Sequence, residues 1–506
     1  MREQEAQSKG DAARHGLEQP SARHPVRNAS EHDSARQVGE TARDARSQVR
    51  PERNQRDSAS TEKGRCLGLV GWLVVEWVSK PKQDKETPRA RWEWVEHRVW
   101  TDSMLRSLER GIKGGKWYAL IDKVYELKNL QSGFWRVWRN AGSAGIDGQS
   151  VKSFEAKEEQ QLQQLAEELR TESYRPAAVK RVWIPKAGSQ EKRPLGIPVV
   201  RDRVVQAALR NVIEPIFERD FAAQSYGFRP GRGSREALRR VEELLKEGNY
   251  WVVDADIKGY FDNIPHHKLM EKIGKKISDG RVLKLLESYL QAGVMETEKG
   301  WEATPEGTPQ GGVISPLLAN IYLDDLDWEL ARVGLQMVRY ADDFVVLCRR
   351  EEEAIKALER IRRWMEQAQL RLHPDKTKVV DATQRGGFDF LGYHFERGQK
   401  WPRKKSENRL KEKLRQHTRR NNGQSLGCII RRINPILRGW YNYFRFSKLN
   451  ALQNTDGWIR GRLRSILRKR AKKKGRARGK DHQRWRICFF DEAGLFNLTA
   501  ARQQGR

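Results

Sequence analysis

The stretch VRYADDFVVL, residues 338–347, places two adjacent carboxylates, Asp342 and Asp343, between runs of apolar and β-branched residues. The flanking runs predict two short strands, at 336–340 and 344–349. Two strands joined in this way form a hairpin and place the acidic pair at its tight turn. Such a pair next to buried strands needs a chemical reason, because burying a charge without a partner is costly.

A second acidic segment is YWVVDADIKGYFDNI, residues 250–264, which predicts a strand at 250–257. Asp254 and Asp256 lie two residues apart, so they share one face of that strand. If the strand neighbours the hairpin in one sheet, three carboxylates converge, and they repel unless divalent cations neutralise them. Oxygen ligands suit Mg²⁺, and two such ions assist phosphoryl transfer. Taken alone, the acidic pair of the hairpin has a simpler alternative, a solvated turn.

The composition indicates a polyanionic partner. The chain has 506 residues and a formal net charge of +31, and residues 401–480 contain 26 Lys and Arg but three acidic residues. Such concentrated positive charge is typical of nucleic-acid binding, and aromatic residues are interleaved with it. The alternative is a generic basic tail.

The N-terminal part carries few signals of a folded domain. Residues 1–60 are polar and charged with almost no apolar periodicity, which predicts disorder. The apolar run at 66–78 is too short to span a bilayer. A helix-like pattern begins at Met104, and one hypothesis is that the working protein begins there.

The four cysteines, Cys66, Cys348, Cys428 and Cys488, form no CxxC pair. Neither a disulfide framework nor a zinc site is therefore predicted, which fits a reducing cytoplasm.

Residues 104–400 mix predicted helices and short strands, as in an α/β or α+β fold. Further strands are expected at 180–184 and 388–395, and amphipathic helices at 235–248 and 351–370. Beyond 402 the pattern is helical and basic with a break at 421–427, and the run 468–480 is expected to be exposed and flexible.

The sequence resembles a known family. YADD (340–343) and the upstream DIKGYFDNI (256–264) look like the two metal-binding palm motifs of reverse transcriptases. The wider motif set, in family order from about 141 to 450, is similar to group II intron-encoded proteins, the maturase–reverse transcriptases.

The resemblance implies a right-hand polymerase fold. Fingers and palm, with an antiparallel palm sheet, are expected at 104–400, and an α-helical thumb or maturase X domain at 401–465. A basic DNA-binding tail at 466–506 and a poorly defined extension at 1–103 complete the expected organisation.

The resemblance also implies roles for individual residues. Asp256, Asp342 and Asp343 are expected to be catalytic and to bind two Mg²⁺ ions. Phe261 corresponds to the steric gate that selects deoxynucleotides, with a core phenylalanine as the alternative. The other expected nucleotide contacts are Lys186, Arg193, Gln310 and Lys376; Lys376 is a candidate proton donor to pyrophosphate or, alternatively, a structural lysine.

Expected RNA contacts lie in two further motifs. QSYGFRPGRGSREAL (224–238) offers Arg229 and Arg232 to the template backbone. INPILRGWYNYFRF (433–446) resembles the thumb, where cations and rings suit RNA; its candidates are Arg438, Tyr441, Tyr443 and Arg445. The alternative for any of these rings is burial in a helical core. FDFLGYHF (388–395) resembles the primer-grip hairpin.

The expected function is therefore RNA-directed DNA synthesis, together with binding of the intron RNA to promote splicing and mobility. The implied partners are the intron RNA, an RNA template with a DNA primer, dNTPs, target DNA and, as an open alternative, a second copy in a homodimer. Only Cys488 follows the thumb motif, so no HNH-type endonuclease is expected. Two rivals are a domesticated or defence-associated reverse transcriptase without an intron, and a splicing-only RNA-binding maturase.

Overall fold

The computed structural model describes residues 91–504 apart from 113, 186–191, 297 and 476–477. All of these residues belong to one compact unit, Pro81–Arg506. The expected disorder at 1–60, the apolar run at 66–78 and Lys186 lie outside the described residues.

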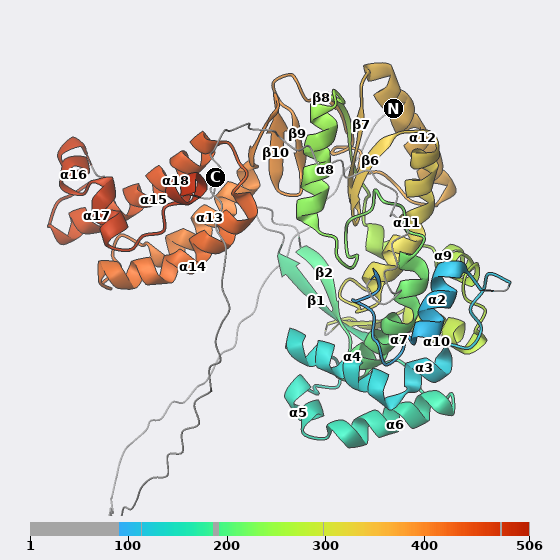
Figure 1. Cartoon of the computed structure of the whole chain (residues 1–506). Coiled ribbons are helices and arrows are strands. Elements are labelled where there is room, and N and C mark those ends of the chain that lie inside the picture. Colours follow the sequence, from blue (N-terminus) through green and yellow to red (C-terminus); the bar gives the residue numbers. More distant parts are fainter. Residues whose placement is uncertain (1–90, 113, 186–191, 297, 476–477, 505–506) are drawn as a thin grey trace, which may run out of the picture. The chain divides into compact units, whose positions relative to one another are not determined.

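A four-stranded antiparallel sheet has the strand order β6-β7-β3-β8 (Figure 1). Its strands are β3 (Trp251–Asp256), β6 (Gln336–Tyr340), β7 (Asp343–Cys348) and β8 (Lys378–Asp381). β6 and β7 form the predicted hairpin, and β3 pairs with β7. The two acidic segments are therefore neighbours in one sheet, which is the condition on which the predicted convergence of carboxylates depended.

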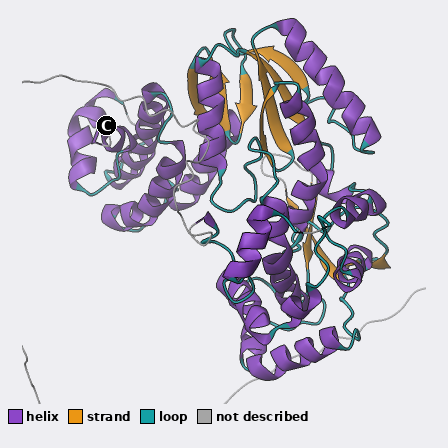
Figure 2. Cartoon of the chain, turned by 45° about the vertical axis from the view of Figure 1, so that its right-hand side comes forward, coloured by secondary structure: helices purple, strands orange, loops and turns teal. Residues whose placement is uncertain are grey.

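Both faces of this sheet are apolar, because alternate residues of its strands enter different cores. Val253 and Val346 pack into the larger core, which includes residues of three helices among others. Val252 and Val345 instead pack into a smaller core with a fourth helix and the strands β9 (Phe388–Phe390) and β10 (Tyr393–Glu396). Figure 2 shows the strands with helices on both sides. The three helices are α9 (His266–Gly274), α11 (Ser315–Arg332) and α12 (Glu351–Gln367), and the fourth is α8 (Ser234–Lys246). The amphipathic helices expected at 235–248 and 351–370 are confirmed as α8 and α12.

A second sheet has the order β2-β1-β4-β5 and is flanked by helices. Its strands are β1 (Val179–Pro185), β2 (Lys192–Ile197), β4 (Val294–Glu296) and β5 (Gly300–Glu302). The helices of this part are α2 (Asp102–Arg110), α3 (Ile121–Tyr125), α4 (Leu127–Asn140), α5 (Val151–Glu155), α6 (Glu158–Arg170), α7 (Val200–Glu218) and α10 (Gly280–Gln291). α7 is buried along almost its whole length. α4 packs closely on it at Gly133, where a Cβ atom would lie 2.7 Å from the carbonyl oxygen of Val204.

The N-terminal boundary expected at 103 and 104 is wrong for the described residues. Trp92, Val95, Val99 and Trp100 are buried in the larger core. The Trp100 ring meets Trp117 edge-on at 5.4 Å, and its Nε1 donates to the carbonyl of Asn211 at 3.0 Å. A chain beginning at Met104 would remove this tryptophan from a closed core.

The helix-like pattern after Met104 is also interrupted. α2 ends at Arg110, and the glycines that follow, Gly111, Gly114 and Gly115, all adopt positive φ angles. These conformations are easy for glycine and stop a right-handed helix. The pattern resumes as the separate helices α3 and α4.

The segment expected as one strand at 388–395 is instead two. Leu391 and Gly392 adopt φ angles of 46° and 85°, so the chain reverses between β9 (Phe388–Phe390) and β10 (Tyr393–Glu396). β11 (Gln399–Pro402) completes a three-stranded antiparallel sheet in the order β11-β10-β9. The Phe388 and Phe395 rings stack with centroids 5.1 Å apart, which closes the face of this sheet against α8. The hairpin that the primer-grip resemblance implied is thus present.

The C-terminal region is helical, with the break expected at 421–427 between its first two helices. It contains α13 (Lys404–His417), α14 (Leu426–Phe444), α15 (Leu449–Arg470), α16 (Gly479–Arg484), α17 (Ile487–Glu492) and α18 (Leu498–Gln504). The expected basic tail at 466–506 is not separate in the described residues, because Phe490 and Leu498 are fully buried in the same core as Ile433 and Leu463. The basic run thus joins two packed elements. No helix in the described ranges is both long and apolar enough to cross a bilayer.

Replacing Trp100 with alanine is expected to lower the free energy of unfolding by about 3–5 kcal/mol, because the change empties a closed core site and leaves the Asn211 carbonyl without its donor. Urea unfolding followed by circular dichroism measures this change. Ile355→Ala on α12, where the side chain is 45% exposed, is the control and should cost less than about 1 kcal/mol. Equal stability of Trp100→Ala and the unmodified protein would contradict the assignment of residues 91–103 to the core.

Candidate active site

The β6–β7 turn carries Asp342 as the sequence predicted, but Asp343 belongs to the strand that follows. Tyr340 pairs with Asp343 in the hairpin register, so the turn itself consists of Ala341 and Asp342. Ala341 adopts a φ angle of 60°, in the left-handed region that a non-glycine residue rarely enters. Asp342 therefore leads out of a constrained turn, and Asp343 is the first residue of β7.

The strand β3 brings the second acidic segment to the same place. Asp256 lies directly opposite Asp343 in the antiparallel register, and Asp254 lies two residues earlier on the same face. Directly opposed residues have Cβ atoms about 4.5–5.5 Å apart. Asp342 interacts electrostatically with Asp256 from the turn. The structure thus brings together Asp256, Asp342 and Asp343, with Asp254 beside them.

The electrostatics of this cluster are unfavourable as it stands. Burial raises the pKa of Asp343 to about 7, and the neighbouring carboxylates of Asp254, Asp256 and Asp342 add to the shift. Burial likewise raises the pKa of Asp254 to about 6, and burial and Asp256 raise that of Asp342. Raised pKa values mean that the charged forms lack sufficient counter-charge, so the site favours a cation.

Lys376 supplies one positive charge. Its Nζ donates to Asp256 Oδ2 at 2.5 Å. The segment that carries it is tied to the end of β3, because the His373 amide donates to the Asp256 carbonyl at 2.8 Å and the Lys258 amide to the Arg371 carbonyl at 2.8 Å. The lysine predicted to act near the nucleotide therefore contacts a carboxylate of the cluster directly.

The cluster suits a divalent cation in its chemistry, since its donors are carboxylate oxygens without sufficient counter-charge. In the described residues, however, no three His, Cys, Asp or Glu side chains are grouped closely enough to hold a metal ion. The ammonium of Lys376 contacts the carboxylate of Asp256.

Phe261 and Gln310 lie on adjoining segments. Phe261 is half-buried in the short 3₁₀ helix η1 (Tyr260–Asp262), and its carbonyl accepts from the Thr308 amide at 2.7 Å. The Gln310 side chain donates to Asp262 Oδ2 at 3.1 Å, and its carbonyl accepts from the Gly196 amide at 2.6 Å. The Gln310 loop thus bridges η1 and β2.

Two further residues of this loop connection were not predicted. Asp262 receives the Gln310 side chain, and Gln206 Oε1 accepts the Val313 amide at 2.8 Å. Gln206 is buried in the middle of α7. No sequence signal sets Gln206 apart, because α7 contains other polar residues that are buried as well, such as Asn211 and Glu214.

Arg193 lies on the predicted β1–β2 hairpin, opposite Ile184, and is exposed. The tip of this hairpin, which carries Lys186, lies outside the described residues. The pairing of these two cations over a nucleotide therefore stays a prediction.

Comparison with known proteins supplies the family. Residues 184–395 match the model of the reverse transcriptase (RNA-dependent DNA polymerase) domain, and residues 407–485 match the group II intron maturase-specific domain. Protein YkfC of Escherichia coli is 34% identical over 332 residues, which cover 58% of this chain and 85% of YkfC. The chain belongs to the group II intron-encoded maturase–reverse transcriptases.

Other relatives match shorter parts of this maturase–reverse transcriptase. The group II intron-encoded protein LtrA of Lactococcus lactis is 40% identical over 189 residues, which are 37% of this chain and about a third (31%) of LtrA. Among solved structures, apo telomerase from Candida tropicalis aligns with 63% of this chain and 59% of its own at 13% identity, with a TM-score of 0.37. The two matched domains and the similarity to LtrA confirm the resemblance that the sequence motifs carried.

Arg229 of the maturase–reverse transcriptase does not face a template in this structure. It is buried, pairs with both carboxylate oxygens of Glu218, and donates to the carbonyls of Ala222 and Ser225. We therefore correct the expectation of an RNA contact, because its donors already hold the loop together. Arg232 is less enclosed and donates to the Ala223 carbonyl at 2.7 Å.

The residues expected to contact RNA on α14 and at its C-cap, Arg445, divide into two kinds. Arg438 and Arg445 are exposed. Tyr443 is instead half-buried and donates to the Leu391 carbonyl at 2.8 Å, so it anchors the β9–β10 turn. Tyr441 is half-buried and packs edge-on against Phe496. The helical-core alternative thus describes the positions of the two tyrosines, and the two arginines are the accessible members.

A cleft of about 730 Å³ leads from the acidic cluster to the maturase-specific domain. Asp343 and Tyr340 line one end, and α13 and α14 line the other. Three cations of the cleft were not singled out from the sequence, since nothing distinguished them among the many cations of residues 401–480. They are Arg403, Arg409 and Lys413.

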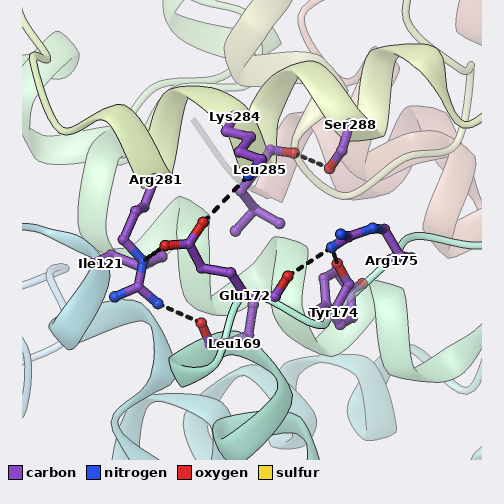
Figure 3. Close-up of a pocket in the computed structure, with 9 residues that line it drawn as sticks. All are labelled: Ile121, Leu169, Glu172, Tyr174, Arg175, Arg281, Lys284, Leu285 and Ser288. Carbon is purple, nitrogen blue, oxygen red and sulfur yellow. Dashed lines mark hydrogen bonds and ion pairs between the residues drawn. The ribbon is translucent and has the colours of Figure 1, made fainter.

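A separate cavity of about 170 Å³ lies among α3, α6 and α10 and contains none of the acidic cluster (Figure 3). Glu172 points between Arg281 and Lys284, with closest N···O distances of 3.4 Å and 3.3 Å. Because no carboxylate of the acidic cluster lines it, the cavity is not part of the candidate active site.

Replacing Asp343 with asparagine is expected to stabilise the protein at pH 8 in EDTA. The folded pKa of about 7 exceeds the unfolded value near 3.8, so the folded state binds more protons and the free energy of unfolding falls as pH rises from 4 to 7. Removing this group should raise the free energy of unfolding by roughly 2–4 kcal/mol at pH 8 and by little at pH 4.

Urea unfolding at the two pH values measures the difference. Asp375→Asn is the control, since that carboxylate is 88% exposed, and it should change stability little at either pH. A pH-independent effect of Asp343→Asn would show that Asp343 is not held in a carboxylate cluster.

Proposed function

We propose that this protein copies RNA into DNA at the acidic cluster and binds group II intron RNA through its maturase-specific domain. The observation that carries the proposal is the placement of Asp256 opposite Asp343, with Asp342 in the adjoining turn, inside a matched reverse transcriptase domain. The raised pKa values support a site that takes up cations.

The cations would be two Mg²⁺ ions, held by Asp256, Asp342 and Asp343. Bound there, they would neutralise the carboxylates and stabilise the attacking and leaving oxygens of nucleotidyl transfer. The protein's own share would be to hold the three carboxylates near one another through strand pairing and a constrained turn.

Lys376 would act beside this cluster. Its side chain is 57% exposed and contacts Asp256 Oδ2, so its ammonium lies next to the reacting groups yet is free to turn outward. A lysine in this position can donate a proton to the departing pyrophosphate. We propose this role for Lys376, with neutralisation of Asp256 as its part when no substrate is bound.

The nucleotide would lie between the cluster and the β1–β2 hairpin. Phe261 and Gln310 lie on segments joined by hydrogen bonds to each other and to β2. We propose that the Phe261 ring excludes a ribose 2′-hydroxyl, which makes dNTPs the substrates. Lys186 and Arg193 would neutralise the triphosphate from the hairpin.

The template and primer would follow the cleft beside Asp343. Arg403, Arg409 and Lys413 line it, and cations spaced along a groove suit a phosphate backbone. Arg232, Arg438 and Arg445 are proposed as further RNA contacts, and the intron RNA would gain stability from the same neutralisation. Contacts with target DNA and a homodimer stay predictions from the sequence.

Asp342→Ala is expected to lower the rate of primer extension on an RNA template by at least about 100-fold. The change removes a carboxylate that is proposed to hold the cations that stabilise charge in the transition state. The assay compares dNTP incorporation at saturating Mg²⁺. Asp325→Asn is the matched control, an acid on α11 with a 57% exposed side chain, and it should leave extension unchanged. Equal extension by Asp342→Ala and the unmodified protein would reject the catalytic assignment.

The double substitution Arg438→Ala with Arg445→Ala is expected to weaken binding of the intron RNA. It should also reduce the slope of log K against log salt concentration by about one to two, because fewer phosphate contacts mean that binding releases fewer counterions. Filter binding between 50 and 300 mM KCl measures both quantities, with Lys152→Ala on α5 as the control.

The same two assays separate the rivals. An enzyme without an intron partner would extend primers and show no preference for intron RNA over a scrambled RNA. A splicing-only protein would bind the intron RNA and extend nothing.

A further inference from the structure

Arg339, two residues before the acidic turn, is a fully buried cation whose guanidinium is completely engaged. Its Nε and Nη2 donate to the two carboxylate oxygens of Asp327 at 2.7 and 2.5 Å. Nη2 also donates to Ser225 Oγ at 2.8 Å, and Nη1 donates to Asn320 Oδ1 and to the Ala341 carbonyl, both at 3.0 Å. One side chain thus joins α11, the loop before α8 and the acidic turn.

The contact with Ala341 is the unusual one. Ala341 has a φ angle of 60°, a conformation that costs a non-glycine residue about 1 kcal/mol or more and persists only when its surroundings hold it. The guanidinium holds the carbonyl of this residue, and the next residue is Asp342. The orientation of the Asp342 carboxylate therefore depends on a conformation that the Arg339 contact stabilises.

A glycine closes the turn from the opposite side. A Cβ atom on Gly227 would lie 2.4 Å from the Ala341 amide nitrogen, so the loop backbone lies directly against the turn. Asn320 donates to the Gly227 carbonyl at 2.8 Å and accepts from Arg339, which connects the loop to the guanidinium. The loop also pairs with β6, since the Tyr226 amide donates to the Arg339 carbonyl at 2.8 Å.

We propose that Arg339, clamped by Asp327, is the positioning residue of the catalytic turn: it holds the Ala341 carbonyl and thereby sets the Asp342 carboxylate for catalysis. The inference rests on the proposed polymerase function and deepens it. Stability alone is a poor reason for this arrangement, because two buried charges gain little over apolar residues of the same volume. The planar guanidinium donates to a carboxylate and to a backbone carbonyl at the same time, so it fixes the positions of these two groups relative to each other.

The test is Arg339→Lys, which keeps the charge and loses the fork. A single ammonium cannot reach both Asp327 oxygens and the Ala341 carbonyl. We expect kcat of primer extension to fall about 100-fold, which is the usual effect of displacing a catalytic group by about 1 Å. KM for dNTP and the affinity for the primer–template duplex should change less than about threefold.

The matched control is Arg281→Lys in the cavity of Figure 3. The Arg281 guanidinium also donates to backbone carbonyls, those of Leu169 and Arg170 at 2.6 and 2.9 Å, and faces the carboxylate of Glu172. It has no contact with the acidic turn. The kcat of the Arg281→Lys variant should stay within about twofold of the kcat of the unmodified protein.

A second readout needs no polymerase activity. Hydrogen exchange of the intact chain, followed by mass spectrometry of peptides covering 336–348, should be at least about tenfold faster in Arg339→Lys and unchanged in Arg281→Lys. If the unmodified protein fails to extend primers, the proposed function falls, and this exchange comparison decides the positioning role by itself.

Asp327→Asn provides an independent variant of nearly unchanged volume and should reproduce both results. Unchanged kcat and exchange in Arg339→Lys would overturn the proposal. A loss of duplex affinity with faster exchange throughout the chain, or failure of both variants to fold, would overturn it as well, since Arg339 would then serve the fold as a whole.

Discussion

In the sheet β6-β7-β3-β8, the antiparallel register sets Asp256 directly opposite Asp343, so two like charges face each other across neighbouring strands. Backbone hydrogen bonds and apolar cores on both faces hold this register, and a slip by one residue would send the acids to opposite faces. The backbone register therefore keeps these two carboxylates close together although their negative charges repel each other. Burial raises the pKa values of Asp254, Asp342 and Asp343, and repulsion from neighbouring carboxylates adds to the shift.

Basic side chains lie around the acidic cluster. Lys376 contacts Asp256 from the segment after α12, and the cleft that opens at Asp343 is lined by Arg403, Arg409 and Lys413. Cations therefore approach the acids from separate parts of the chain. A site that concentrates negative charge suits divalent cations, and a cationic groove beside it suits a nucleic-acid backbone.

Two buried arginines, Arg229 and Arg339, have different hydrogen-bond partners. Arg229 pairs with Glu218 and with carbonyls of its own loop, so it stabilises the loop. Arg339 pairs with Asp327 and reaches the carbonyl of the acidic turn. Both occur within motifs rich in glycine or acids, and their sequence neighbourhoods do not reveal which partners they meet. Only the folded contacts distinguish an arginine that holds its own loop from one that reaches the acidic turn.

The tertiary structure also decided which aromatic residues are accessible. The motif on α14 offers rings and cations at similar spacing, yet the Tyr443 hydroxyl is committed to the Leu391 carbonyl whereas Arg438 stays exposed. Helical periodicity cannot make this distinction, because the partner strand is more than 40 residues away in the chain. The same limitation hid Trp100, whose burial depends on α7 and the Trp117 segment.

What the sequence by itself determined was the local geometry: the alternating apolar residues around YADD specify a hairpin, and the two-residue spacing of Asp254 and Asp256 places them on one face. These features depend on neighbours within a few residues, and the family motifs extended them to a fold and an activity. What only the tertiary structure decided was which strand lies beside the hairpin, which cations stay exposed, and that residues 91–103 and the C-terminal residues Phe490 and Leu498 complete the cores. These outcomes depend on contacts between distant segments, whose partners are chosen by packing and by the desolvation of charge.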